Sequence, residues 1–452
     1  MNLNNLKNIY QSSPFFIKKL YSLIPWDIRM GRVYRSTLKF LNKSFLWREI
    51  DWKAYQENEL KKLLIFCNKN VSYYKKQFRE YEINVYSNDI FKEFNKIPFI
   101  NKDIVTKNIH EFIPNKIENS YSATTGGTTG KPMKVIYDKN SFQAEWAYKI
   151  FFWNKALGYK ASSRKATFRG VAEKNRLFFE NPIYNEVRFS PFELNGIQMK
   201  MIVNKLLNYN PQYIHGYPSA VEQLANYFEK NNLRLQNLNG IMLISENIYS
   251  HQKKKIEKVF DCKIYSFYGH SERVVFASML NDFDIYYAHP AYGVTELVRE
   301  DNSLINTNEE LGEIVGTGFI NRAMPLIRFK TNDFSSWSDK ESKINFPKLN
   351  RIKGRWTQEF LVGKNDKKVS LTSLNMHSDV FMKIKQSQYV QNKKGTVILN
   401  LVVENNFKKE DENIIINEFM KKLGNEFEIK ICYVDCLQMT KAGKIKFLIQ
   451  DL

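Results

Sequence analysis

The chain has 452 residues. A single hydrophobic core is rarely that large, so we expect two or three domains. Its 43% apolar and 14% aromatic residues are typical of a globular protein, and no run reaches the about 18 uncharged apolar residues of a membrane span. A formal charge of +21 favours polyanionic partners, but the excess is spread along the chain without a nucleic-acid-binding motif, so we predict no nucleic-acid partner.

The cysteines and the amino terminus bear on where the protein is located. Four scattered cysteines are too few for a disulfide framework, and no further Cys or His completes a metal site around Cys432 and Cys436. The first residues lack the short apolar core of a secretion signal. We therefore predict a cytoplasmic protein, with the inner face of the membrane as the alternative location.

Residues 1–48 are basic and aromatic. Nine Lys and Arg residues stand against the single acid Asp27, and nine aromatic residues are interleaved with them. Such a segment could lie on an anionic membrane surface as a peripheral contact. It could equally be a helical extension that packs its aromatic rings onto the main domain. The sequence leaves both interpretations open.

A helix is predicted from Glu49 to near Asn70. Apolar residues recur there at i, i+3, i+4 and i+7, with Lys and Glu between them. These residues are Leu60, Leu63, Leu64 and Cys67.

Residues 121–135, YSATTGGTTGKPMKV, crowd glycines and hydroxyl groups together more than any other stretch. Glycines let a backbone wrap closely around a bulky anion, and the threonines and the lysine add donors and a cation. The spacing differs from that of the P-loop, because three residues separate Gly126 from Gly130 and Pro132 stands where Ser or Thr should follow the lysine. The stretch predicts a phosphate-binding loop made of Thr125, Gly126, Gly127, Thr128, Thr129, Gly130 and Lys131.

Strands and helices alternate between residues 211 and 267. A short strand after Pro211 turns into a helix with an expected capping box of Ser219 and Glu222. A strand over 241–245, a helix over 249–260 and a strand over 263–267 follow. This order predicts a parallel sheet, with ligands at the carboxyl ends of its strands. Those ends carry Ser245, Glu246 and the run Tyr268, Gly269, His270, Ser271 and Glu272.

The last part of the chain reads as a separate domain. After a strand near 311–319 and the run MPLIRFKTND, which ends at Asp333, a linker is expected at GRWTQE, residues 354–359. A strand over 396–403, a helix over 411–423 and a strand over 428–434 then predict a small α+β domain. We predict an α/β protein with a basic aromatic extension (1–48), a large domain of mixed and parallel sheets flanked by helices (49–354) and a C-terminal α+β domain on a hinge (355–452).

Five of these motifs, in this order, resemble the adenylate-forming (acyl-CoA synthetase/luciferase-like) superfamily. The glycine-rich loop resembles TSGTTGxPK, with Gly126 for Ser and Met133 for Lys. YGHSE resembles YGxTE, and MPLIRFKTND resembles MPLIRYxTGD with Asn332 for Gly. GRWTQE resembles the hinge motif, with Thr357 at the hinge position. TKAGKIKF, near the end of the chain, resembles the motif that carries the catalytic lysine. Lead-in segments at 70–78 and 97–104 resemble the phenylacetate-CoA ligase-like branch, and the overall pattern resembles capsular polysaccharide biosynthesis (CapK-like) proteins.

The resemblance implies a role for each matched residue. The loop from Thr125 to Lys131 would cradle the phosphates of ATP, with Ser245, Glu246, Tyr268, Gly269 and Ser271 also in the ATP site. Glu272 would hold Mg²⁺, while Asp333 and Arg355 would bind the ribose. Lys444 would be the catalytic lysine. The acyl pocket would be lined by His215, Tyr217, Tyr268 and His270.

The function implied by the resemblance is AMP-forming ligation. ATP and Mg²⁺ would activate a small carboxylic or amino acid as an acyl-adenylate, and an acceptor would then displace AMP. In surface polysaccharide biosynthesis that acceptor would be an amine on a sugar; in the wider family it is coenzyme A. A catalytically degenerate nucleotide-binding protein is the further alternative. The sequence does not name the acid, the acceptor or the oligomeric state.

Overall fold

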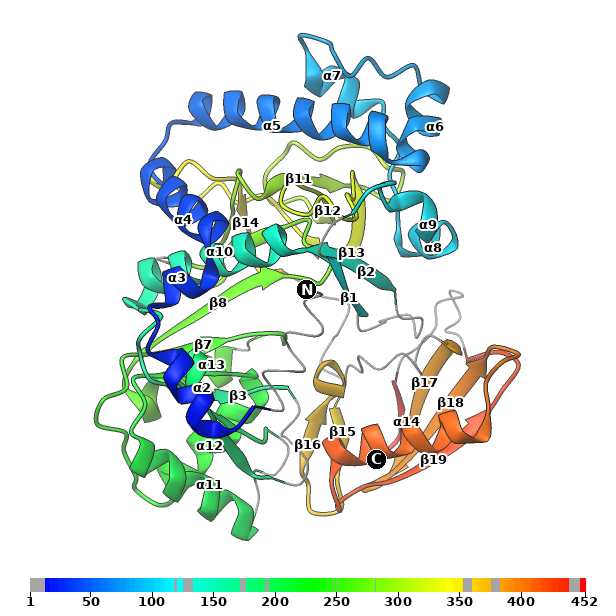
Figure 1. The fold of residues 1–452 in the computed structure, drawn as a ribbon. Helices are drawn as coiled ribbons and strands as arrows, with labels where there is room; N and C mark the ends of the chain where they lie inside the picture. The colour runs from blue at the N-terminus through cyan, green and yellow to red at the C-terminus, as the bar shows by residue number, and fades with distance from the viewer. Residues whose placement is uncertain are drawn as a thin grey trace. The chain divides into compact units, whose positions relative to one another are not determined.

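The computed structural model describes residues 13–117, 120–124, 133–170, 176–191, 194, 196–246, 248, 250–280, 282–352, 360–374, 383–438 and 448–452 (Figure 1). The chain divides into two compact units. Unit 1 comprises residues 1–123, 134–161 and 266–355, and unit 2 comprises residues 124–133, 162–265 and 356–452. Among the described residues, no helix is long and apolar enough to cross a membrane.

Unit 1 begins with a series of helices. They are α2 (Phe15–Ser22), α3 (Trp26–Met30), α4 (Arg32–Ser44), α5 (Glu49–Asn70), α6 (Ser72–Glu80), α7 (Ile90–Asn95), α8 (Lys102–Lys107) and α9 (Ile109–Phe112), and α10 (Lys139–Leu157) follows later in the chain. The helix predicted from Glu49 is confirmed, and its four predicted apolar residues are fully buried. The side-chain nitrogen of Gln56 on α5 donates to the carbonyls of Pro290 (3.2 Å) and Gly293 (2.9 Å), which ties α5 to the start of a strand (Figure 1).

Most of the aromatic amino-terminal segment packs onto α10. The rings of Trp26 and Trp146 meet edge-on at 5.3 Å, and those of Phe45 and Phe151 at 5.4 Å. Gly31 adopts φ +88°, and a Cβ there would lie 3.0 Å from the side chain of Gln143, so glycine is needed for this close approach. From Trp26 onward the segment therefore follows the packing interpretation, whereas α2 buries none of its residues.

The strands of unit 1 form antiparallel arrangements. One runs β8 (Lys263–Gly269), β9 (Phe276–Ser278), β10 (Tyr286–Ala288) and β14 (Lys348–Leu349), and a second is β11 (Gly293–Val298), β12 (Gly312–Gly318) and β13 (Phe329–Ser335). The short pair β1 (Ser120–Thr124) and β2 (Lys134–Asp138) flanks the glycine-rich loop. The core of this unit is strongly aromatic; Trp52, Tyr148 and Phe346 surround the ring of His289.

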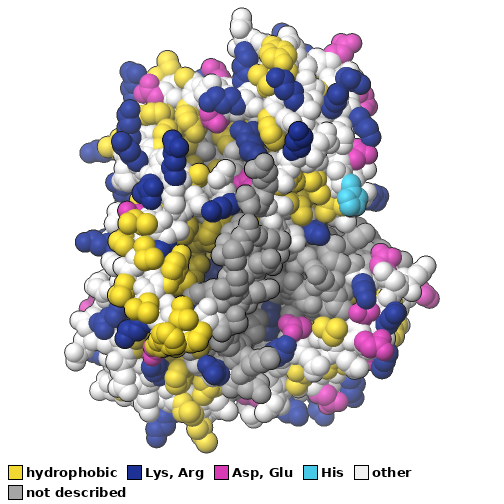
Figure 2. All heavy atoms as spheres, in the orientation of Figure 1, with side chains coloured by type: hydrophobic (Ala, Val, Ile, Leu, Met, Phe, Trp, Pro, Cys, Tyr) yellow, Lys and Arg dark blue, Asp and Glu magenta, His cyan; other side chains and the backbone are white. Residues whose placement is uncertain are grey.

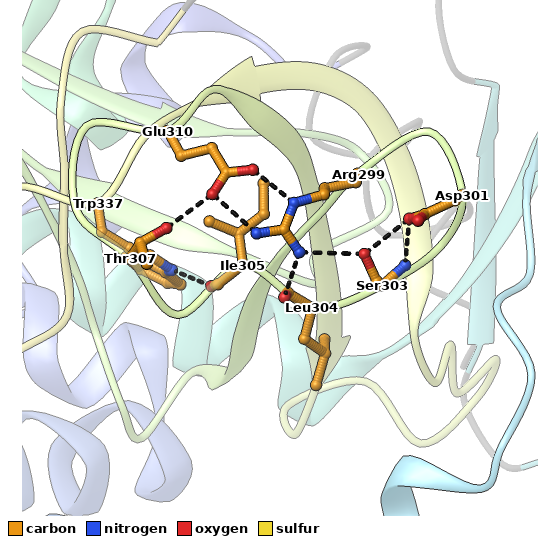
Figure 3. A network of polar contacts seen from close by, with 8 residues as sticks. All are labelled: Arg299, Asp301, Ser303, Leu304, Ile305, Thr307, Glu310 and Trp337. Atoms are coloured by element: carbon orange, nitrogen blue, oxygen red, sulfur yellow. Dashed lines mark hydrogen bonds and ion pairs between the residues drawn. The ribbon is translucent and has the colours of Figure 1, made fainter.

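Side-chain hydrogen bonds shape the connection between β11 and β12 (Figure 3). The Arg299 guanidinium binds both carboxylate oxygens of Glu310 and also donates to the hydroxyl of Ser303 and the carbonyl of Leu304, each at 3.0 Å. The indole nitrogen of Trp337 donates to the carbonyl of Ile305 at 2.7 Å. Because the Arg299 and Glu310 side chains are more than a third exposed, this network fixes the shape of the loop more than it adds stability.

Unit 2 contains the predicted parallel sheet. Its order is β7 (Gly240–Leu243), β6 (Tyr213–Gly216), β3 (Lys165–Phe168), β5 (Glu186–Phe189) and β4 (Phe178–Asn181), with only β4 antiparallel among them. The helices of this part are α11 (Gly196–Tyr209), α12 (Pro218–Lys230) and α13 (Ser250–Phe260), with a 3₁₀ turn at Pro182–Tyr184. Strand, helix and strand alternate from β6 to β8 as the sequence predicted.

The predicted capping box of α12 is wrong. The helix starts two residues earlier than the box requires, at Pro218, so Ser219 lies inside its first turn. Both the amide and the hydroxyl of Ser219 donate to the carboxylate of Glu246, each at 3.0 Å, and Glu222 instead accepts a hydrogen bond from Gln252 at 2.8 Å. A carboxylate from the next strand end therefore caps the helix, which a local pattern cannot reveal.

The C-terminal residues have a core of their own. The elements are β15 (Phe360–Val362), β16 (Lys368–Ser370), a 3₁₀ turn at Leu371–Leu374, β17 (Ile384–Lys393), β18 (Thr396–Val403), α14 (Lys409–Leu423), β19 (Glu428–Tyr433) and β20 (Leu448–Gln450). The main sheet has the order β19, β18, β17, β20. The helix begins two residues before its predicted start, because Asp411 accepts the amide of Lys408 (2.8 Å) and so lies in the first turn. The α/β fold class, with its separate α+β domain, is confirmed.

Candidate active site

Two of the predicted motifs meet in unit 1. The hydroxyl of Tyr268, near the end of β8, donates to Oδ2 of Asp333 on β13 at 2.9 Å, across 65 residues of sequence. Burial raises the pKa of Tyr268 well above its usual value, and the neighbouring Asp333 charge raises it further. The phenol therefore stays protonated and donates to the carboxylate. The segment predicted to lie in the ATP site and the carboxylate predicted to bind ribose thus lie side by side.

Asn332 turns the backbone just before that carboxylate. Its φ is +56°, and its amide donates to Oε1 of Glu313 at 2.8 Å. Asn is the residue after glycine that best tolerates this left-handed conformation, so the replacement of the family's glycine keeps the turn. The following amide, that of Asp333, donates to the hydroxyl of Thr331 at 3.1 Å.

Glu272 lies beside His270. Its Oε2 is 3.4 Å from the imidazole Nδ1, and both side chains are mostly buried. Burial opposes ionisation of Glu272, but the neighbouring His270 outweighs it, and the pKa of the carboxyl falls below its usual value. Neither ring nitrogen of His270 has a well-aligned hydrogen bond to the described residues. An ionised carboxylate beside buried, unsatisfied polar atoms fits a site that takes a charged ligand or Mg²⁺.

Arg273, the next residue, is one that sequence reasoning missed. Its guanidinium donates to the hydroxyl of Ser141 (2.9 Å) and the phenol of Tyr121 (3.1 Å) and lies 4.0 Å from the ring centroid of Tyr137. Tyr137 in turn donates to the carbonyl of Ser271 at 2.5 Å. Tyr121 and Tyr137 stand on β1 and β2, so Arg273 braces the strand pair that carries the glycine-rich loop against the Tyr268–Glu272 segment. A cation directly after the YGHSE run was the available signal.

A buried carboxylate balances the Arg273 charge. Burial disfavours the guanidinium, but the negative charge of Glu145 on α10 outweighs it and raises the pKa of Arg273 above its usual value. Glu145 also accepts a hydrogen bond from the phenol of Tyr292 at 2.6 Å and pairs with Lys149 at 3.1 Å. This charge cluster is therefore compensated, as a buried ion network must be.

Gly269, the last residue of β8, and Ser271 also lie in unit 1, whereas four further predicted residues lie in unit 2. His215 and Tyr217 are buried at the end of β6, and the Tyr217 hydroxyl accepts the amide of Gly170 at 3.2 Å. Ser245 follows β7 with φ +70°, and Glu246 caps α12 as described above. Gly216, the last residue of β6, must be a glycine, since a Cβ there would lie 2.9 Å from the Cβ of Phe168.

Several predicted residues lie outside the described residues. They are the phosphate-loop residues Thr125, Gly126, Gly127, Thr128, Thr129, Gly130 and Lys131, together with Arg355 and Lys444. Thr357, at the predicted hinge, lies outside them as well.

Comparisons with known proteins find similar sequences. Residues 361–451 match the family model of the CapK C-terminal domain. Protein CapK of Staphylococcus aureus is 25% identical over 99% of this chain and 100% of its own length. Phenylacetate-coenzyme A ligase of Thermus thermophilus is 22% identical over 63% of this chain and 65% of its own.

Solved structures share the fold. A 2-hydroxyisobutyryl-CoA ligase in complex with 2-HIB-AMP and CoA superimposes with a TM-score of 0.62 at 14% identity, covering 91% of this chain and 92% of that one. The same enzyme in its postadenylation state gives a TM-score of 0.55, covering 87% and 88%. The fold is thus that of a solved acyl-CoA ligase. In sequence the chain is similar to protein CapK over 99% of its length and to a phenylacetate-CoA ligase over 63% of it, in agreement with the resemblance seen in the sequence motifs.

Proposed function

We propose that this protein is an AMP-forming ligase that activates a carboxylic or amino acid with ATP and passes the acyl group to an acceptor. The observation that carries the proposal is the Tyr268–Asp333 hydrogen bond, which joins two nucleotide motifs that are far apart in the sequence. A degenerate nucleotide-binding protein remains the alternative, and the experiment below separates the two.

The chain's own residues would mostly position and neutralise charge. Asp333 would accept hydrogen bonds from ribose hydroxyls, with Arg355 as a second donor to the ribose. The loop from Thr125 to Lys131 would cradle the phosphates, and Glu272, whose pKa lies below its usual value, would hold Mg²⁺ as an ionised carboxylate. When bound, Mg²⁺ would neutralise charge on the departing pyrophosphate.

Lys444 would act at the reacting centre. Its ammonium would stabilise the charge that grows on the α-phosphate and the attacking carboxylate. The C-terminal domain, on a hinge at residue 355, would close the site against water, because an acyl-adenylate hydrolyses easily. His215, Tyr217, Tyr268 and His270 would line the acid pocket, with Ser245, Glu246, Gly269 and Ser271 in the nucleotide site.

For the acceptor we favour a sugar amine in surface polysaccharide biosynthesis, in the cytoplasm. Support comes from the CapK relative, which matches the whole chain. Coenzyme A is the second candidate, supported by the solved ligase that holds it. Peripheral membrane contact through residues 1–48 also belongs to the proposal.

The test of activation is ATP–pyrophosphate exchange across a panel of carboxylic and amino acids. One acid should drive exchange in the wild type, and Lys444→Ala should lower the rate by about 100-fold or more while ATP still binds. Lys421→Ala, which removes an exposed lysine of the same domain, should keep the wild-type rate. Exchange that survives Lys444→Ala would contradict the assigned role, and ATP binding with no AMP formed from any acid would favour the degenerate protein.

The acceptor is tested once the acid is known. AMP release in the presence of that acid should rise on addition of amino-sugar nucleotides and not on addition of coenzyme A. The opposite result would assign the protein to the acyl-CoA ligases.

A further inference from the structure

We infer that α2, the turn after it and the start of α3, residues 15–28, form a surface that docks on an anionic lipid bilayer. This inference deepens the membrane contact within the proposed function and assigns it to a defined segment. It rests on the exposure, the helical pattern and the charge of these residues.

The segment exposes large apolar side chains next to one another. Relative exposure is 63% for Phe16, 62% for Leu20, 74% for Leu23 and 58% for Ile28. Phe15, Ile17, Tyr21 and Ile24 are also exposed. Figure 2 shows these apolar side chains gathered in the region of α2 and α3. Monomeric proteins rarely leave so contiguous an apolar patch in water, so a partner is expected.

The pattern of α2 is that of a helix lying in an interface. At about 100° per residue, Phe16, Ile17, Leu20 and Tyr21 fall on one side of the helix. Lys18, Lys19 and Ser22 fall on the other side, together with Phe15 at the start of the helix. A short helix with an apolar side and a basic side can lay its rings into the acyl boundary while its lysines stay at the headgroups.

The turn after α2 is held in place by the chain itself. Nε of Arg29 donates to the carbonyl of Ile24 at 2.8 Å, and its guanidinium lies 5.3 Å from the ring of Trp26, which packs on α10. Arg35 donates to the carbonyl of Asp27 at 3.0 Å. The apolar surface thus continues into a segment that is fixed to the body of unit 1.

The charge around the patch selects anionic lipid as the occupant. Lys19, Arg32, Arg35 and Lys39 are exposed, and Asp27 is the only acid between residues 13 and 48. Basic residues beside an apolar helix are attracted to the negative cytoplasmic leaflet, each contributing a few-fold in affinity. An apolar protein partner would not require this excess of positive charge.

The test is co-sedimentation of the full chain with vesicles of phosphatidylcholine alone or mixed with phosphatidylglycerol. The wild type should bind the mixed vesicles, and salt should weaken the binding. Phe16→Asp with Leu20→Asp should lower partitioning by about tenfold or more. Lys19→Glu with Arg32→Glu should lower it by about tenfold, through charge alone. No binding of the wild type to the mixed vesicles would overturn the inference.

Matched controls distinguish binding through this surface from nonspecific binding to vesicles. Ile197→Asp removes an equally exposed apolar residue (77%) on α11, and Lys230→Glu with Lys254→Glu removes exposed charges elsewhere. Both should leave vesicle binding unchanged, and an equal loss in the controls would refute the docking surface. Light scattering tests self-association. A dimer that Phe16→Asp with Leu20→Asp dissociates, and that does not bind vesicles, would make the patch a protein interface instead.

The ligase proposal fails separately. The α2 variants should keep the wild-type rate of ATP–pyrophosphate exchange in the absence of vesicles. If the wild type shows no exchange but binds mixed vesicles through α2, the function is wrong and the docking surface stands.

Discussion

At the scale of single residues, the site depends on side chains whose protonation is set by burial and by one neighbour. Tyr268 remains a donor because it is buried next to the Asp333 carboxylate. Glu272 remains ionised although it is buried, because His270 is adjacent. Neighbouring groups that are held in opposite roles by their environments are typical of nucleotide and catalytic sites.

Arg273 is expected to be a positioning residue. Arg273→Met leaves the Glu145 carboxylate buried with less compensation and should lower the free energy of unfolding by about 3 kcal/mol. Glu145→Gln combined with Arg273→Met should lose less than the sum of the two single variants. Chemical denaturation measures both effects.

The role of Arg273 in positioning needs a second measurement. Arg273→Lys keeps the charge but not the planar donor fork. The KM for ATP should therefore rise, whereas the free energy of unfolding should change little. Arg299→Met removes the exposed ion pair of Figure 3 and is the control, with a small change in stability and none in KM. An unchanged KM for ATP in Arg273→Lys would mean that the brace serves stability alone.

At the scale of elements, a buried charge cluster joins β3 to β5. Glu186 lies opposite Lys165 in the parallel register, 3.4 Å from its ammonium, and pairs with Arg188 at 2.6 Å. It also accepts hydrogen bonds from Thr167 (2.7 Å) and Asn181 (2.9 Å). Burial opposes ionisation, but these charges and donors outweigh it and lower the pKa of Glu186 to about 2.

This cluster predicts acid sensitivity. The pKa of Glu186 is lower in the folded state than its ordinary value of 4.5, so the stabilisation is complete above about pH 4.5 and is lost as pH falls toward about 2. The lost contribution is about 3 kcal/mol. Denaturant unfolding from neutral to acid pH should show a shallower decline for Glu186→Gln than for the wild type. Glu180 on β4 forms a partly exposed ion pair with Lys205, so Glu180→Gln should follow the wild-type curve.

At the scale of the whole molecule, the C-terminal residues contain a self-contained core. Residues from β15 to β20 bury fourteen apolar side chains against one another, including Leu361, Leu399, Ile415 and Phe419. The family-model match covers the same part of the chain, residues 361–451. A segment with its own core and its own family match is expected to fold alone.

The isolated fragment 360–452 should therefore unfold cooperatively on heating. Phe419→Ala should lower its stability by about 3–5 kcal/mol, because Phe419 is only 3% exposed in that core. Lys421→Ala, on the exposed side of the same helix, should leave the melting temperature nearly unchanged. Circular dichroism measures both, and a fragment without a cooperative transition would contradict an independent domain.

The sequence by itself determined the class of fold and the order of the motifs. Hydrophobic period and glycine placement are local properties, so the helix from Glu49, the alternation from β6 to β8 and the turn at Asn332 could be predicted within a few residues. The loop from Thr125 to Lys131 and Lys444 stay predictions, because they lie outside the described residues.

The tertiary structure decided which residues meet. The Tyr268–Asp333 pair and the contact of Arg273 with Tyr121 join residues 65 and 152 positions apart, through strand registers that no local pattern specifies. The same holds for Glu246, which replaced the predicted cap of α12. Only packing could separate the amino-terminal segment into a part that is buried on α10 and a helix whose apolar side stays exposed, because periodicity identifies an apolar face but not what covers it.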